Sequence, residues 1–294
     1  MKQQRKVSNY SKKAWAALSF AVWVITINIC VLGLAQAAQK QTVNYDVYAG
    51  GFHVVDAKLD VDLKTKNRYD LALEAKTQGF LRNLAPWDGV FRSEGWYDPK
   101  HGKARPQKHE SITVWKDEHE EKQYYYNKDG SFREYRVKDD ENDGSPRPVD
   151  EALTDQTTDV LSATLEVMEH VAKEKGCQGT SEVFDGKRRF QMIFRQSKQV
   201  TLTSNAYNVY SGPALECTIE VKPVAGDWHK KPRGWMSIQE QGRERGTMPT
   251  IWFAAVAPGA PAVPVKIRVK TEYGTLFMHM TGYQGEQKTL KLEE

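Results

Sequence analysis

Apolar and polar residues alternate along long stretches of this chain, and no other feature constrains its fold as strongly. Val55, Ala57, Leu59, Val61 and Leu63 are separated by single, charged residues, and residues 43–48 and 69–76 repeat the pattern. A period of two places the apolar side chains on one face of a strand. The pattern therefore predicts antiparallel strands with one buried and one solvated face.

Segments with strand character continue to residue 281. Tight-turn signals such as Asp129-Gly130 and Asp185-Gly186 separate several of them, and the short segment 236–239 is also expected to be a strand. Strands this numerous at such short spacing are typical of one extended sheet. The chain is therefore predicted to be mainly β, with a large curved antiparallel sheet or an open barrel.

One segment has helical periodicity instead. Val160, Leu161, Leu165, Met168 and Val171 lie at the spacing of a single helix face. We expect one amphipathic helix over residues 158–174, with the sheet wrapped around it. The candidate N-caps are Asp155, Thr157 and Thr158, and Gly176 suits the C-terminal end.

The first 37 residues have the pattern of a secretory signal peptide. Five positively charged residues and no acidic residue precede an apolar run at residues 14–34, and Ala35-Gln36-Ala37 then supplies the small residues of a cleavage site. The run is also long enough to cross a bilayer, so an uncleaved anchor is the alternative. The small residues favour cleavage, and the rest of the chain is expected in the periplasm of a Gram-negative cell.

Removal of this segment changes the charge of the protein. The whole chain has a net charge of +4, and the loss of five positive charges leaves −1. No basic surface for phosphates is then expected, which argues against a nucleic-acid partner. Membrane association is expected only if the N-terminal segment is retained.

Two of the three cysteines, Cys177 and Cys217, follow the predicted signal peptide. Disulfides persist in oxidising compartments such as the periplasm, and two cysteines allow a single pairing. These facts favour a disulfide between Cys177 and Cys217. The alternatives are two free thiols or half of a metal site, although neither cysteine lies in a C-x-x-C motif.

Residues 38–294 are predicted to form a single exported β-rich domain, in which the polar and acidic residues 139–150 form a solvated loop. The domain contains no nucleophile elbow, no phosphate-binding loop and no H-E-x-x-H among its histidines. The sequence therefore predicts no enzyme, no catalytic residue, no metal site and no cofactor. Its histidines are expected to be solvated or hydrogen-bonded at the surface.

Aromatic residues gather between residues 80 and 96. Residues 80–87 form an apolar loop between two predicted strands, and ligand-binding β proteins often use such a segment at the mouth of a cavity. The candidate ligand-binding residues are Phe80, Trp87, Phe91 and Trp96. The alternative is that these rings fill the core beneath a strongly curved sheet.

Several short motifs follow one another along the domain. They include YDVYAGG at residues 45–51, RSEG at 92–95, TDVLSA at 158–163 and FDGKRR at 184–189. In these motifs the chain resembles the exported domain of unknown function 3108 family. The resemblance implies an envelope β-sheet domain, similar in architecture to the curved-sheet lipoprotein carriers that wrap an apolar concavity around helices. The resemblance does not indicate a catalysed reaction.

These features predict a periplasmic protein that binds an apolar or amphipathic component of the cell envelope, in the manner of a lipid or lipoprotein carrier. An alternative is a scaffold that maintains envelope integrity by docking another periplasmic protein. A third interpretation, a glycan-directed hydrolase, has no catalytic motif to support it. The expected partner is therefore a lipid or an envelope protein.

Overall fold

The computed structural model describes residues 39–64, 67–230, 234–271 and 274–292; the predicted signal peptide at residues 1–37 lies outside them. The described residues form fifteen strands, all within one antiparallel sheet, and four helices. The sheet does not close, because its order runs from β8 at one edge to β9 at the other. The prediction of a mainly-β fold with a large antiparallel sheet around one helix is confirmed.

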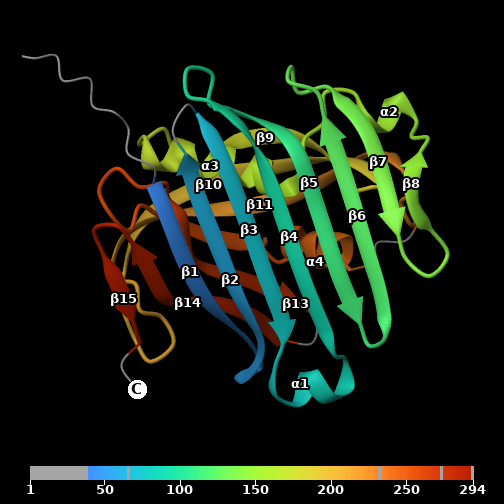
Figure 1. The fold of residues 1–294 in the computed structure, drawn as a ribbon. Helices are drawn as coiled ribbons and strands as arrows, with labels where there is room; N and C mark the ends of the chain where they lie inside the picture. Colours follow the sequence, from blue (N-terminus) through green and yellow to red (C-terminus); the bar gives the residue numbers. More distant parts are fainter. Residues whose placement is uncertain (1–38, 65–66, 231–233, 272–273, 293–294) are drawn as a thin grey trace, which may run out of the picture. The chain divides into compact units, whose positions relative to one another are not determined.

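The sheet consists of two meanders that meet where β1 pairs with β14 (Figure 1). The first meander contains β1 (Gln39–Ala49), β2 (Phe52–Lys64), β3 (Arg68–Thr77), β4 (Trp87–Asp98), β5 (Lys103–Trp115), β6 (Glu118–Tyr126), β7 (Phe132–Lys138) and β8 (Asp143–Arg147). The second contains β9 (Gly179–Phe184), β10 (Arg188–Leu202), β11 (Gly212–Gly226), β12 (Thr250–Ala254), β13 (Val263–Thr271) and β14 (Gly274–Gly285), and β15 (Thr289–Lys291) pairs with β14.

Helix α3 (Val160–Ala172) lies between the two meanders. It contacts β4 and β5 of the first and β9, β10 and β12 of the second. Its bounds agree with the predicted helix at 158–174. The N-cap is Asp159, however, and not one of the three candidates before it. The short helix α2 (Glu151–Thr154) precedes α3 on the connection between the two sheet edges.

The main core fills the space between the meanders and α3. Fully buried side chains come from α3, from the inward-facing positions of β1–β3 and from β10–β14; they include Val43, Val61, Leu165, Phe253 and Met280. A second, smaller cluster of rings lies under β6 and β7 and consists of Tyr124, Tyr126, Tyr135, Val137 and Phe184. The interior of the curved sheet is therefore packed rather than hollow along most of its length.

The predicted disulfide is present between Cys177 and Cys217, whose Cα atoms are 6.4 Å apart. Cys177 follows α3, and Cys217 lies in β11. The bond thus attaches the segment after the helix to the second meander. Both cysteines are fully buried. For a sequence separation of 40 residues, the loop-closure entropy of such a bond is worth about 4 kcal/mol.

Three segments differ from the sequence prediction. Residues 236–239, expected to be a strand, belong to helix α4 (Trp235–Glu244), and the predicted apolar loop at 80–87 contains helix α1 (Gly79–Leu84). The predicted loop at 139–150 includes the edge strand β8. None of the helices within the described part of the chain combines the length and apolar character that a membrane span requires.

Candidate functional site

An apolar pocket of about 320 Å³ lies at the N-terminal end of α3. Its apolar lining consists of Leu73, Phe91, Tyr124, Val160, Leu161 and Phe184. Phe91 and Leu161 belong to or pack against the main core, whereas Tyr124 and Phe184 belong to the smaller ring cluster. The pocket is therefore a gap between two packed regions, in an interior where voids are normally few and small.

Four polar residues complete the lining: His109, Ser111, Lys122 and Asp185. The charged groups have partners, since Lys122 pairs with Glu120, and Arg188 Nη2 lies 2.6 Å from Asp185 Oδ2. His109 is only 9% exposed, so the expectation of a surface histidine is wrong at this position. The pocket is apolar with a polar side, as in many sites for small amphipathic ligands.

A buried hydrogen-bond network extends from His109 to the start of α3. Ser93 Oγ lies 2.7 Å from His109 Nδ1 and donates to Asp159 Oδ1 at 2.6 Å. Ser162 Oγ donates to the other carboxylate oxygen of Asp159, Oδ2, at 2.6 Å, and Tyr69 OH lies 2.7 Å from Ser162 Oγ. The Asp159 side chain is 1% exposed. All its bonds are therefore made inside the protein.

Each hydroxyl has one proton, which sets the direction of every bond in this network. Ser93 and Ser162 donate to Asp159. Their oxygens must then accept from His109 Nδ1–H and from Tyr69 OH. Burial raises the pKa of Tyr69 well above its usual range, which keeps this donor protonated. His109 also lines the pocket, and its second ring nitrogen, Nε2, can form a hydrogen bond with a ligand.

The order of these groups differs from that of a nucleophilic serine site. Such a site places the histidine between the serine and the carboxylate, so that the imidazole removes the serine proton. Here Ser93 donates its proton to the carboxylate and is 1% exposed, and the same His109 nitrogen, Nδ1, lies 2.7 Å from Ser93 Oγ and 3.4 Å from Asp159 Oδ1. The network therefore holds the start of α3 and does not activate Ser93.

The local sequence explains how the network forms. Asp159 has an extended backbone and caps α3, since its Oδ1 accepts from the Ser162 backbone N–H at 2.9 Å. A Cβ atom at Gly95 would lie 2.8 Å from Tyr69 OH, so the missing side chain leaves room for this hydroxyl to reach Ser162. Ser93 and Gly95 come from the RSEG motif, and Asp159 and Ser162 from the TDVLSA motif. Two motifs far apart in the sequence thus meet here.

The four predicted ligand-binding residues do not lie together. Phe91 lines the apolar pocket, and Trp87 lies on the same face of β4, with its ring over Gly89 between them. Trp96 lies on the opposite face, where the guanidinium carbon of Arg68 is 4.4 Å from its ring centre. Other residues that line the apolar pocket were not among the predicted ligand-binding residues. Leu73, Tyr124 and Phe184 are examples, and they come from three separate strands.

Phe80 lies at one end of the first meander, in α1. It is 51% exposed, and its ring centre is 5.5 Å from that of Phe52, which is 64% exposed. Leu84, also in α1, is 70% exposed. Phe80 therefore belongs to an exposed apolar surface, the α1 end, which is formed by Phe52, Phe80 and Leu84.

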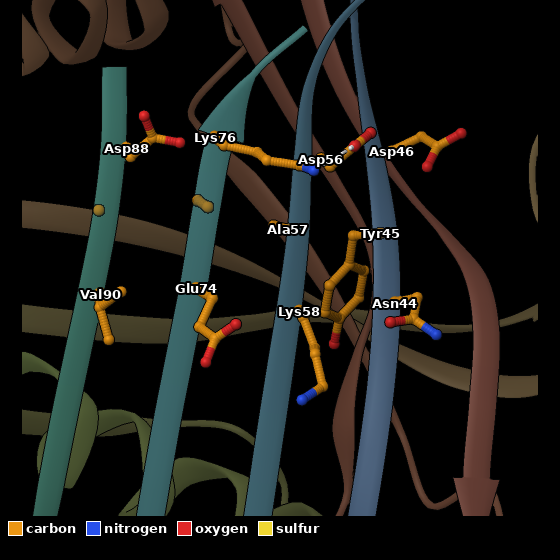
Figure 2. Close-up of a pocket in the computed structure, with 12 residues that line it drawn as sticks. Asn44, Tyr45, Asp46, Asp56, Ala57, Lys58, Glu74, Lys76, Asp88 and Val90 are labelled. Atoms are coloured by element: carbon orange, nitrogen blue, oxygen red, sulfur yellow. Dashed lines mark ion pairs between the residues drawn. The ribbon is translucent and has the colours of Figure 1, made fainter. Parts of the chain in front are cut away.

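A second pocket, of about 530 Å³, lies across β1–β4 (Figure 2). Its floor includes small residues such as Ala57 and Ala75, and its charged side chains lie on the face of the sheet away from the core. The charged residues of this lining are Asp46, Asp56, Lys58, Glu74, Lys76 and Asp88. Two of the carboxylates have cationic partners: Arg82 Nη1 lies 2.8 Å from Asp88 Oδ2, and Lys76 Nζ lies 3.9 Å from Asp56 Oδ2.

The fold defines a class: a mainly-β domain whose open antiparallel sheet surrounds one helix. The family model described as protein of unknown function (DUF3108) matches residues 44–281, and the chain belongs to this family. The fold is similar to that of the β-barrel-like protein of domain of unknown function DUF1849 from Brucella abortus, with 9% identity and a TM-score of 0.45 over 86% of this chain and 100% of that one. A search of curated proteins gives no match.

Proposed function

We propose that this protein is a non-enzymatic binding protein of the Gram-negative periplasm, and that the pocket at the N-terminal end of α3 holds an apolar or amphipathic molecule of the cell envelope. The observation that supports this best is the gap between the main core and the ring cluster. A ligand there would bury apolar side-chain surface that the two clusters leave accessible.

The size of the pocket limits the ligand. A volume of about 320 Å³ lies at the lower end of the range for small-molecule pockets. This is enough for a short acyl segment or a small ring compound, and too little for a whole diacyl lipid. The proposed ligand is therefore smaller than the lipid or lipoprotein cargo expected from the sequence.

The lining also suggests how the ligand would be oriented. Phe91, Tyr124 and Phe184 would surround its apolar part. The polar end would then lie near His109 Nε2, Ser111 and the ammonium group of Lys122. A ligand with an acidic or hydroxyl head group and an apolar tail fits this distribution.

The proposed compartment rests on two features. The first is the signal-like pattern of residues 1–37, and the second is the disulfide between Cys177 and Cys217. Structural disulfides are common in periplasmic proteins and rare in the bacterial cytoplasm. A periplasmic protein would also have direct access to envelope lipids and their fragments.

A pair of tryptophan substitutions tests the binding proposal. Val160 lines the pocket and is 42% exposed, while Val224 in β11 is 47% exposed and lies outside the lining. We expect octanoate, titrated calorimetrically, to bind the wild type and Val224→Trp alike, and Val160→Trp at least tenfold more weakly. Equal binding by all three proteins, or no binding by the wild type, would overturn the proposal.

A second candidate function is docking to another envelope protein through the α1 end. The observation that favours it is the exposure of Phe52, Phe80 and Leu84 together at one end of the molecule, since clustered exposed apolar residues often mark an interface. Crosslinking in the periplasm should give a discrete partner with the wild type and with Val224→Ser. The variant Phe80→Ser/Leu84→Ser should lose that partner.

A further inference from the structure

We infer that Asp46, His53 and Asp56 form a binding site for a divalent metal ion on the outer face of β1 and β2. One potential ligand atom from each residue lies within 4.8 Å of the other two. His53 Nε2 is 2.8 Å from Asp56 Oδ1 and 3.9 Å from Asp46 Oδ1. This site is independent of the apolar pocket and of the function proposed for it.

The distances fit a small metal ion. Zinc bonds of about 2.1 Å in tetrahedral geometry separate neighbouring ligand atoms by about 3.4 Å. The two distances from His53 Nε2, 2.8 and 3.9 Å, lie on either side of that value. Side-chain movements of about 0.5–0.6 Å would bring both distances to the tetrahedral value. Solvent would supply the remaining ligand, because all three residues are partly exposed.

The strand register places the two carboxylates together. β1 and β2 form a hairpin around Gly50 and Gly51, both with positive φ, and Asp46 lies directly opposite Asp56. Like charges in directly opposite positions destabilise a sheet. Lys76 Nζ reaches no closer than 3.9 Å to Asp56 Oδ2, and its side chain is 56% exposed. A bound cation would neutralise this pair more completely.

Neighbouring groups orient the three side chains. Tyr48 OH donates to Asp46 Oδ2 at 3.2 Å, and Gln78 donates to Asp56 Oδ2, so that the Oδ1 atom of each carboxylate faces His53. The ring of His53 stacks on that of Tyr48, with centres 5.4 Å apart. Hydrogen bonds from surrounding residues that fix the ligands are a regular property of metal sites.

The His53 nitrogen itself points to a missing ligand. His53 Nε2 is shielded from solvent and, within the described part of the chain, no group hydrogen-bonds it. Asp56 Oδ1 lies 2.8 Å from this nitrogen without forming a hydrogen bond with it. A metal ion held between the imidazole nitrogen and the two carboxylate oxygens would give Nε2 a partner.

The donor atoms indicate the class of ion. Calcium and magnesium prefer oxygen ligands alone, whereas imidazole nitrogen with carboxylate oxygen suits zinc and similar transition-metal ions. We therefore expect Zn²⁺ to bind more tightly than Ca²⁺. The sequence pointed to no metal site, because none of its histidines lies in a known metal-ligand motif.

Calorimetric titration of the purified, EDTA-treated protein with ZnCl₂ tests the inference. We expect one Zn²⁺ per chain, at least tenfold weaker binding by His53→Gln and by Asp46→Asn, and a smaller loss for Tyr48→Phe. The matched control is His101→Gln: His101 Nδ1 lies 2.7 Å from Asp98 Oδ2, also three residues away in the sequence, but without a second carboxylate in the cluster. This variant should bind like the wild type.

Unfolding of each variant in EDTA confirms that loss of binding is not loss of folding. Replacement of ZnCl₂ by CoCl₂ adds a visible absorption spectrum that reports nitrogen and oxygen ligands directly. Zn²⁺ binding that is equal in the wild type, His53→Gln and Asp46→Asn would overturn the site, as would the absence of any binding by the folded wild type.

Discussion

Two groups of carboxylate and histidine side chains in this protein have similar members and opposite surroundings. Around Asp159, both carboxylate oxygens accept hydrogen bonds from buried donors, and His109 donates to Ser93. Around Asp56, a second carboxylate lies opposite on β1, and among the described residues His53 Nε2 has no hydrogen-bond partner. The first group is internally complete, and the second is not.

The difference shows what each group can contribute. In the Asp159 network, the hydrogen bonds hold α3 against β3, β4 and β5. Mutation of these residues should therefore lower the free energy of unfolding. In the outer cluster, His53 Nε2 lacks a hydrogen-bond partner among the described residues, so mutation should change ligand binding instead. The residue types alone would not separate these two cases.

The largest expected effect is that of Asp159→Ala. The substitution removes a helix cap, worth about 1 kcal/mol, and leaves buried partners unsatisfied at about 1–3 kcal/mol. We expect the free energy of unfolding in urea to fall by about 3 kcal/mol. Asp155→Ala, at an exposed position four residues earlier, should change it by less than about 0.5 kcal/mol. Equal effects of the two variants would contradict the structural role of the network.

Tyr69→Phe should have a smaller effect of the same sign. It removes only the hydroxyl that donates to Ser162, and a typical hydrogen bond contributes about 1 kcal/mol. Tyr207→Phe is the matched control, since Tyr207 is 52% exposed and contacts its neighbours through its ring. If both variants unfold at the same urea concentration, the Tyr69 bond adds nothing to stability.

Asp56→Asn should not lower the free energy of unfolding, in contrast to the two variants above. In the metal-free protein it relieves the repulsion from Asp46, so we expect unchanged stability or a gain of up to about 1 kcal/mol. The gain should shrink as salt screens the charges. Urea unfolding in EDTA at low and high salt measures both effects. A clear loss of stability would mean that Asp56 belongs to a closed network like that of Asp159.

The smallest expected effect concerns His170, in the last turn of α3. Burial lowers the pKa of His170, nearby lysines lower it further, and Glu166 opposes them. The unfolded chain therefore takes up the proton more readily. The contribution of neutral His170 is complete above the unfolded pKa of about 6.5 and is lost as the pH falls through the lower folded value.

We accordingly expect His170→Gln to flatten part of the fall in unfolding free energy between about pH 7 and pH 5. The exposed His229 offers a control, since His229→Gln should leave the profile of the wild type unchanged. A steeper profile in His170→Gln would show that the sign of the effect has been assigned wrongly.

The fold was largely predictable, because period-two alternation and one helical stripe directly reflect burial. Helix α4 was missed for a physical reason. Its segment 236–239 alternates Met-Ser-Ile-Gln, and four residues are too few to separate a strand from a helix turn. The structure buries Gln239 by pairing its amide with both backbone groups of Val221, a long-range contact that no local pattern contains.

The sites were predictable only in part. Ser93, Asp159 and Ser162 lay in recognisable motifs, but their meeting with Tyr69 and His109 depends on four different elements. The glycine turn between Asp46 and Asp56 nearly suffices to predict that these two residues lie opposite each other. A bulge between Val47 and Tyr48 shifts the register, however, and a shift of one residue moves every side chain to the other face. Phe80 and Trp96 could not be assigned to a face without the structure.

The seam between β1 and β14 has a consequence for how the chain is made. It joins residues such as Gln41 and Gly285, which are the ends of a very long loop. Because synthesis begins at the N-terminus, β1 keeps a free edge until β14 has been made. Unpaired strand edges invite pairing with other chains, and contacts this distant form slowly. While it folds, this protein should therefore depend on a holding factor more than a meander of the same size whose edge strands are neighbours in the sequence.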